Sequence, residues 1–229
     1  MSKLILVPTP IGNLGDITMR SLEVLRAASL ILAEDTRTTR ILLDRYGISA
    51  PLRSHHKFNE HRTIDPLCDN IENGKITVLV SDAGTPGISD PGFLIVRRCI
   101  EREIPVEVLP GPTAFVPALV SSGLPCDRFC FEGFLPQKKG RQKRIASLVS
   151  EERTMVFYES PFRVLKTLEQ LSSALGDDRR ASVSRELTKK FEETLRGTLS
   201  YLAQHFRETA PRGEFVIIVA GASFKEQAE

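Results

Sequence analysis

The sequence has 229 residues, with 31 lysines and arginines against 29 aspartates and glutamates, so its net charge is only +2. Hydrophobic residues make up 41% and charged residues 26%, a composition typical of a globular protein and not of a disordered chain. The longest apolar runs, 4–7 and 215–220, are far shorter than the ~20 residues of a membrane helix. The N-terminus also lacks the apolar region of a signal peptide. We therefore expect a cytoplasmic protein with no membrane partner.

The first half of the chain alternates short apolar segments with amphipathic ones. The apolar segments predict strands at 4–8, 30–33, 51–55, 76–81 and 106–109. The amphipathic segments predict helices at 21–29, 38–46, 60–72, 90–103 and 113–122. Gly47 is expected to end the second helix, and Asp90 to cap the fourth. Strands joined by helices of this length form right-handed βαβ units, so this half predicts a mainly parallel sheet.

The second half has more strands that can pair directly. Strands are predicted at 128–134, 154–159, 181–186, 192–195, 197–198 and 215–220, with helices at 143–150, 162–175 and 199–207. Direct pairing with fewer intervening helices predicts a mixed sheet. The composition changes at 121–125, where we place the linker. The fold class is therefore α/β, with two domains at 1–123 and 124–229.

Three loops rich in glycine and proline follow predicted strands, at 8–16, 81–92 and 110–114. Parallel sheets bind ligands at the carboxyl ends of their strands, so these loops are the best candidates for ligand contact. The first loop is nearly a dinucleotide-binding fingerprint, with Glu34 about 20 residues later where a ribose-binding acid would lie. Pro10 stands where the first glycine should be, however, and proline fixes φ and lacks an N–H. A nicotinamide enzyme thus stays an alternative.

A basic stretch at 138–144 carries five cations in seven residues and is either a solvated face or a phosphate-contacting patch, which Lys189 and Lys190 would extend. Phe131, Phe134 and Phe162 are expected in the core rather than stacked on RNA bases. The four cysteines are scattered, and the histidines near 55–61 lack partners at ligand spacing, so no metal site is expected.

The motifs together resemble the tetrapyrrole methylase family, and within it the branch that methylates RNA of the small ribosomal subunit. The stretches that carry the resemblance span nearly the whole chain in one order: PTPIGNLGD at 8–16, AEDTR at 33–37, SDAGTPGISDPG at 81–92, PGPTA at 110–114, GFLP at 133–136, YESPFR at 158–163, SRELTK at 184–189 and GEFVIIVAG at 213–221. The resemblance implies two α/β domains with S-adenosylmethionine in the cleft between them, a homodimer, and methylation of a cytidine ribose 2′-hydroxyl in 16S rRNA.

The resemblance also places the cofactor contacts. In the first half of the chain they fall on Ile11, Asp82, Ala83, Gly84, Thr85, Thr113 and Ala114. In the second half they fall, to within a residue or two, on Tyr158, Leu187, Gly213 and Glu214. The residues alone favour the loops around Asp82 and Thr113. Without the family, Tyr158 and Leu187 would be interpreted as core residues.

Methyl transfer to a hydroxyl requires alignment and a proton acceptor, which a carboxylate or a water supplies. The carboxylates at strand ends or in the first loop are the candidates for this base: Glu34, Asp35, Asp16 and, in the second half, Glu159. Arg37 either holds a phosphate or forms a salt bridge within 34–37. The substrate-binding candidates are Pro10, Gly12 and Asn13 under the ribose, Arg37, and the basic side chains Lys138, Lys139, Arg141 and Lys143.

Three alternatives remain open at this point. A nicotinamide oxidoreductase rests on the first loop and Glu34. A methylase acting on a tetrapyrrole or another small molecule shares the fold and cofactor, but it gives little reason for the basic stretch. A non-catalytic RNA-binding module explains that stretch and leaves the glycine-proline loops without a role.

Overall fold

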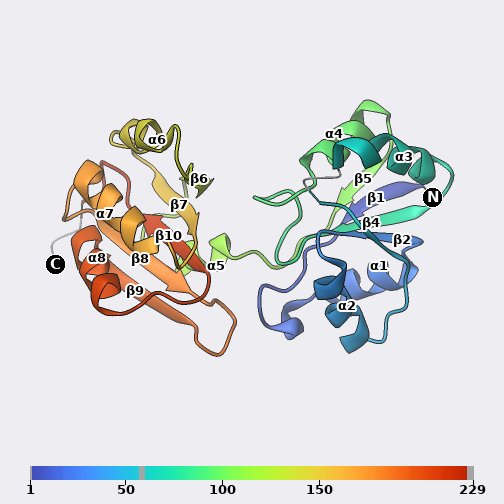
Figure 1. The fold of residues 1–229 in the computed structure, drawn as a ribbon, viewed down its shortest axis with the longest axis horizontal. Helices are drawn as coiled ribbons and strands as arrows, with labels where there is room; N and C mark the ends of the chain where they lie inside the picture. The colour runs from blue at the N-terminus through green and yellow to red at the C-terminus, as the bar shows by residue number, and fades with distance from the viewer. Residues whose placement is uncertain (1, 57–59, 226–229) are drawn as a thin grey trace. The chain divides into compact units, whose positions relative to one another are not determined.

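The computed structural model describes residues 2–56 and 60–225. The chain divides into two compact α/β units, one ending at Thr113 and the other beginning at Ala114 (Figure 1). Each unit contains one five-stranded sheet with helices packed against it. The predicted fold class is therefore confirmed, and each unit is described by itself below.

The N-terminal unit contains a fully parallel sheet in the order β3-β2-β4-β1-β5. Its strands are β1 (Lys3–Leu6), β2 (Leu30–Ala33), β3 (Leu52–Ser54), β4 (Ile76–Val80) and β5 (Val106–Val108). Its helices are a 3-10 turn η1 (Leu14–Asp16), α1 (Met19–Ala27), α2 (Thr36–Arg45), α3 (Glu60–Glu72) and α4 (Phe93–Glu101). Alternate residues of each strand face opposite sides, so α1 and α2 bury one face of the sheet while α3 and α4 bury the other (Figure 1).

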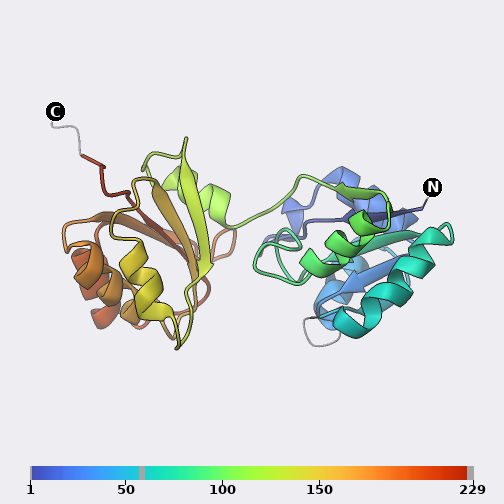
Figure 2. The same ribbon diagram turned by 90° about the horizontal axis from the view of Figure 1, so that it is seen from above.

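The C-terminal unit contains a mixed sheet in the order β6-β7-β10-β8-β9, in which only β6 and β7 are parallel. Its strands are β6 (Phe129–Phe134), β7 (Thr154–Glu159), β8 (Arg180–Arg185), β9 (Glu193–Thr198) and β10 (Phe215–Val219). Its helices are α5 (Phe115–Ser121), α6 (Arg141–Ser147), α7 (Val164–Leu175) and α8 (Leu199–Glu208). Helices α6, α7 and α8 share one apolar core with the sheet, seen in yellow to red in Figure 2.

Helix α5 belongs to the second unit, so the boundary lies earlier than the expected one after residue 123. The reason is packing against β7 and β10 and against the rings of β6. The ring centroid of Phe115 lies 5.1 Å from that of Phe131 and 6.1 Å from that of Phe129. The composition change at 121–125 marks the loop after α5 and not the junction between the units.

Most predicted elements are present within a few residues of their expected ends. Gly47 has φ of +60° and follows the last residues of α2, as expected for a glycine that ends a helix. The capping role assigned to Asp90 is wrong, because α4 begins at Phe93 and its N-cap is Gly92. The expected strands at 192–195 and 197–198 form the single strand β9. Within residues 2–56 and 60–225, no helix has both the length and the hydrophobicity to cross a membrane.

Candidate active site

The three glycine-proline loops of the N-terminal unit meet at one edge of its sheet. All five strands run in the same direction, so the loops that follow β1, β4 and β5 leave from the same edge. Thr9 and Gly84 exchange two backbone hydrogen bonds of 2.9 Å, and the Thr9 hydroxyl donates to the carbonyl of Ser81 at 3.0 Å. The Thr85 hydroxyl donates to the carbonyl of Pro112 at 3.2 Å. The second loop is therefore bonded to both of the others.

Glycine allows this close approach at two positions. Gly84 has φ of +80°, and a Cβ added to it would lie 3.6 Å from Ile11 Cγ2 and 3.8 Å from the carbonyl oxygen of Pro112. A Cβ on Gly111 would lie only 2.7 Å from Cβ of Pro8, so no larger residue fits there without movement. The structure thus places Gly84 close to Ile11 and to the backbone of Pro112 and Thr113.

Acidic side chains collect where β2 and β4 end. Asp82 accepts a hydrogen bond of 2.9 Å from the backbone N–H of Asp35. Burial, and then the negative charge of Asp82, raise the pKa of the Glu34 carboxyl above its usual value. The pKa of Asp90 is raised to about 6, mainly by burial and also by the negative charges of Glu34 and Asp82. A hydrogen bond from Ser81 opposes this shift. These carboxylates repel one another, so this edge of the sheet favours a positively charged ligand.

The other two acidic candidates have different surroundings. Asp35 is the N-cap of α2, and its carboxylate accepts from Arg37 through the backbone N–H at 2.8 Å and the side-chain Nη2 at 2.6 Å. These bonds lower the pKa of Asp35 to about 2, which makes it a poor proton acceptor. Arg37 thus forms the salt bridge that was one of its two expected roles. Asp16 is exposed at the end of η1.

The predicted cofactor residues of the C-terminal unit also share one edge of their sheet. Phe215, which begins β10, pairs with Glu159 at the end of β7 and with Arg185 at the end of β8. Tyr158 pairs with Val216. The segment 213–214 therefore lies between the ends of the two strands that lead to Tyr158 and Leu187.

A strained turn follows β8 at this edge. Glu186 and Thr188, on either side of the buried Leu187, have φ of +50° and +65°, a conformation that residues other than glycine rarely adopt. The Glu186 carboxylate accepts from the backbone N–H of Glu214 at 3.0 Å and from Lys189 Nζ at 2.9 Å. Strain that persists because neighbouring bonds enforce it is typical of functional sites.

Comparison with known proteins identifies the family. The sequence matches Tetrapyrrole (Corrin/Porphyrin) Methylases over residues 3–203. The chain belongs to the tetrapyrrole methylase family. The resemblance seen in the motifs is therefore confirmed.

The relatives within the tetrapyrrole methylase family point to one branch. The "Ribosomal RNA small subunit methyltransferase I" of Synechocystis sp. is 50% identical over 97% of this chain and 80% of its own length. The protein of the same name from Thermotoga maritima is 45% identical over 96% of this chain and 99% of its own length. The uroporphyrin-III C-methyl transferase of Thermus thermophilus, solved in complex with S-adenyl homocysteine, has a TM-score of 0.65 at 18% identity, covering 94% of this chain and 96% of that one. This last likeness concerns the fold.

The basic stretch of this tetrapyrrole methylase divides into two kinds of side chain. The buried Arg141 donates from Nε to Gln170 and from Nη2 to Thr167, both at 2.7 Å. Arg144 forms a two-pronged salt bridge with Glu132. The lysines of the stretch are exposed and have no ion pair among the described residues: Lys138, Lys139 and Lys143. Arg141 therefore positions this stretch. We call these three lysines, two in the loop after β6 and one in the first turn of α6, the cationic loop.

A buried network holds the start of α7 in place. Glu159 is 3% exposed, and its carboxylate accepts from the Ser160 N–H and from Arg163 Nε at 2.8 Å, and from the Thr167 hydroxyl at 2.7 Å. Thr167 in turn accepts from Arg141. Both oxygens of Glu159 thus accept hydrogen bonds from protein donors, which favours a structural role over that of a base.

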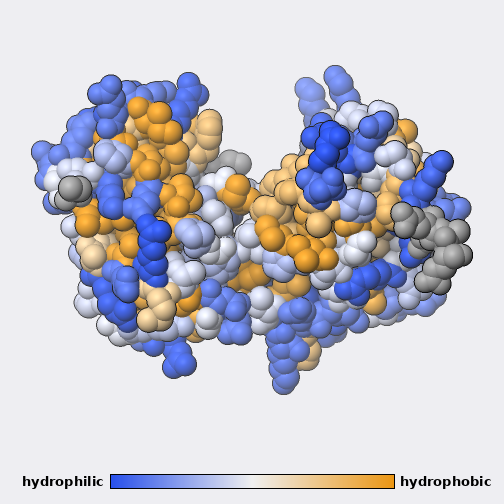
Figure 3. Space-filling view, turned by 180° about the vertical axis from the view of Figure 1, so that it is seen from behind, coloured by the Kyte–Doolittle hydropathy of each residue, from blue (hydrophilic) through white to orange (hydrophobic). Residues whose placement is uncertain are grey.

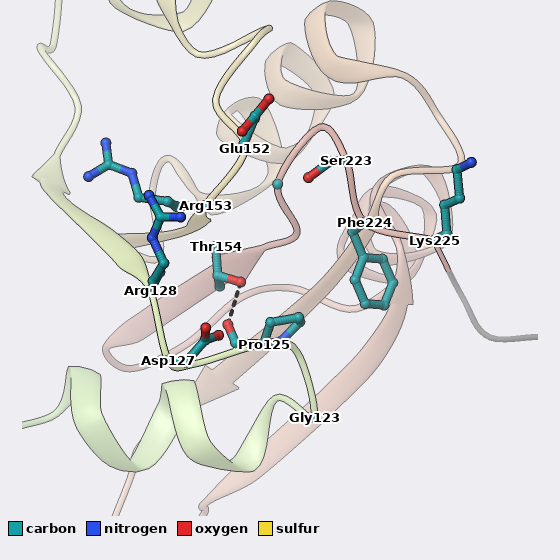
Figure 4. Close-up of a pocket in the computed structure, with 11 residues that line it drawn as sticks. Gly123, Pro125, Asp127, Arg128, Glu152, Arg153, Thr154, Ser223, Phe224 and Lys225 are labelled. Carbon is teal, nitrogen blue, oxygen red and sulfur yellow. Dashed lines mark hydrogen bonds between the residues drawn. The ribbon is translucent and has the colours of Figure 1, made fainter.

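A cavity of about 690 Å³ opens in the C-terminal unit, away from the predicted residues (Figure 4). Thr154, at the start of β7, lies in its wall and donates a hydrogen bond of 2.6 Å to the Pro125 carbonyl. Because β7 begins here and ends at Glu159, the cavity lies at the sheet edge opposite to Tyr158. It contains none of the predicted site residues.

Sequence reasoning missed two features of these edges. Asp90 was interpreted as a helix cap, although it stands before Pro91 in a loop that already contained Asp82. Glu186 received no role, because its positive φ and its bonds to the segment at 213–214 are not visible in the sequence. The acidic content of the 81–92 loop was the one signal that pointed to Asp90.

Proposed function

We propose that this protein uses S-adenosylmethionine to methylate the ribose 2′-hydroxyl of a cytidine in 16S rRNA. The observation that carries the proposal is that three rigid loops are bonded together at the edge of the sheet where the carboxylates of Glu34, Asp82 and Asp90 also lie. It occurs in a chain whose relatives, at 45% and 50% identity, bear the name of ribosomal RNA methyltransferases. The exposed lysines of the cationic loop support an RNA substrate over a tetrapyrrole.

The residues present suit this cofactor. S-adenosylmethionine has a sulfonium, an ammonium and ribose hydroxyl groups. The mutual repulsion of Glu34, Asp82 and Asp90 decreases when a cation binds beside them. In the N-terminal unit the proposed contacts are Ile11, Asp82, Ala83, Gly84, Thr85 and Thr113. In the C-terminal unit they are Ala114, Tyr158, Leu187, Gly213 and Glu214. When bound, the cofactor supplies an activated methyl group.

The protein's own groups orient the hydroxyl and accept its proton. Among the three acidic candidates of the N-terminal unit, Glu34 is best suited as the base, because its raised pKa brings it closer to neutral pH than Asp35. Asp16 remains a candidate in the first loop. The stiff segment of Pro10, Gly12 and Asn13 would shape the floor under the ribose.

Two measurements test the proposal. Calorimetry with S-adenosylmethionine and with NAD in parallel should show binding of the methyl donor alone. Incubation of labelled donor with small ribosomal subunits that lack the modification should then place the label on a cytidine ribose. Binding of NAD alone would support the oxidoreductase alternative. Donor binding with no label in the RNA would overturn the RNA substrate and favour a small-molecule methylase.

The cationic loop is predicted to contact RNA phosphates. Replacing Lys138, Lys139 and Lys143 with alanine should reduce the slope of log affinity against log salt by about 2–3, with the affinity for S-adenosylmethionine unchanged. Filter binding with RNA at several salt concentrations measures the slope. In contrast, Arg141→Ala should lower the melting temperature. An unchanged slope in the triple variant would show that these lysines only solvate the surface.

The homodimer implied by the family resemblance is part of the proposal, and sedimentation of the purified protein tests it. Exposed apolar side chains on both units offer surface for such contacts (Figure 3). Phe93 and Ile100 of α4 are each 64% exposed.

A further inference from the structure

Two phenylalanines expected in the core lie on the surface of the C-terminal unit. Phe162, in the turn between β7 and α7, is 94% exposed, and Phe134, at the end of β6, is 52% exposed. Their assignment to the core was wrong. Phenylalanine side chains are usually buried, so a ring left almost wholly in water is unusual.

The backbone that carries Phe162 is held firmly. Glu159 accepts bonds from the residues on both sides of the turn, Ser160 and Arg163, and α7 begins directly after it at Val164. The turn is thus fixed by the buried network while its aromatic ring points out of the protein. A rigid aromatic surface loses little conformational entropy when a flat partner stacks on it.

The sheet brings the two rings and the cationic loop to one edge. Strands β6 and β7 are parallel and Phe134 pairs with Tyr158, with ring centroids 5.6 Å apart, so both strands end side by side. The cationic loop follows β6, and the turn with Phe162 follows β7. The bonds from Arg141 to Thr167 and Gln170 tie the cationic loop to α7.

We propose that Phe162, with Phe134 at the same edge of the sheet, stacks on unpaired bases of the RNA substrate while the cationic loop contacts the adjacent phosphates. The inference rests on the proposed RNA substrate and adds how the strand is read. Aromatic rings beside cations are the surface on which proteins bind single-stranded RNA, since every base has a face that can stack. The charge of the lysines favours a polyanion over an apolar protein partner at these rings.

A tryptophan at position 162 makes the test direct, because the chain has no tryptophan of its own. We expect the fluorescence of Phe162→Trp to be quenched when an unpaired oligocytidine RNA binds. Heparin, which has the charge but no bases, should bind without this quenching. The matched control is Tyr201→Trp. Tyr201 is 55% exposed and lies on α8, which begins after β9 at the sheet edge opposite to Phe162, so this tryptophan should not be quenched by RNA.

A second measurement separates stacking from charge. Phe162→Ala and Phe162→Leu should each weaken RNA binding by roughly 5- to 100-fold with an unchanged salt slope. Phe162→Trp keeps an aromatic ring and should bind RNA about as tightly as the wild type. The proposal is overturned if Phe162→Leu binds RNA like the wild type, or if Phe162→Ala only dissociates a dimer in sedimentation, which would assign the ring to a second copy of the chain. If the lysine variant and the Phe162 variants all leave RNA binding intact, the RNA is bound elsewhere on the protein and this proposal is overturned while the proposed function stands. If the wild type itself neither binds the RNA nor transfers label to it, the proposed RNA substrate is wrong.

Discussion

Replacing Glu34 with glutamine is expected to lower kcat for methyl transfer by about 10²–10⁴-fold, the range typical of a lost general base. Glutamine has nearly the same shape but accepts no proton at neutral pH. The affinity for S-adenosylmethionine should fall by less than about tenfold, because Asp82 and Asp90 keep most of the negative charge at that edge. Single-turnover transfer of labelled methyl groups measures the first effect and calorimetry the second.

The matched variants are Asp35→Asn and Asp16→Asn. Asp35 caps α2 and pairs with Arg37. Because asparagine also caps helices and the ion pair is exposed, Asp35→Asn should lose little stability and have a much smaller effect on kcat than Glu34→Gln. Asp16 should have little effect on either. If Glu34→Gln turns over normally and Asp16→Asn is inactive, the base is Asp16 in the first loop and not Glu34. If all three variants turn over normally, water and not a carboxylate accepts the proton of the hydroxyl.

The second large effect concerns the stability of the C-terminal unit. Glu159→Ala should lower the free energy of unfolding by about 3–5 kcal/mol, because it leaves Arg163 and the hydroxyl of Thr167 without their buried acceptor. Thermal and denaturant unfolding of the whole protein, followed by circular dichroism, measures the loss. The variant should also bind RNA more weakly, since the network supports both Phe162 and the cationic loop.

Two controls accompany this variant. Glu159→Gln keeps an acceptor for Arg163 and should lose less stability than alanine. Glu169→Ala removes the partner of Arg207 in a surface ion pair between α7 and α8, with side chains 43% and 54% exposed, and should cost less than about 1 kcal/mol. Equal losses for Glu159→Ala and Glu169→Ala would mean that the buried network contributes no more than a surface ion pair.

Local patterns were sufficient for most of the fold. The apolar run at 76–80 and the alternation of strands and helices predicted the parallel sheet, because a strand buried on both faces leaves a continuous hydrophobic signal. The junction between the units was not predictable in this way. Whether α5 joins the first or the second unit depends on its contacts with β7 and β10 as well as on the rings of Phe129 and Phe131. Strands β7 and β10 lie far along the chain from α5.

The sequence by itself determined the α/β class, the loops that gather at the strand ends and, through its motifs, the family. These depend on the order and spacing of residues along the chain. Only the tertiary structure decided which candidate side chains are available to a ligand. Arg141 is buried and Asp35 is bound by Arg37, whereas Glu34 is partly buried with a raised pKa and the Phe162 ring is exposed to water. The reason is that exposure and pKa depend on neighbours that chain folding brings from far away, and residue type alone does not specify them.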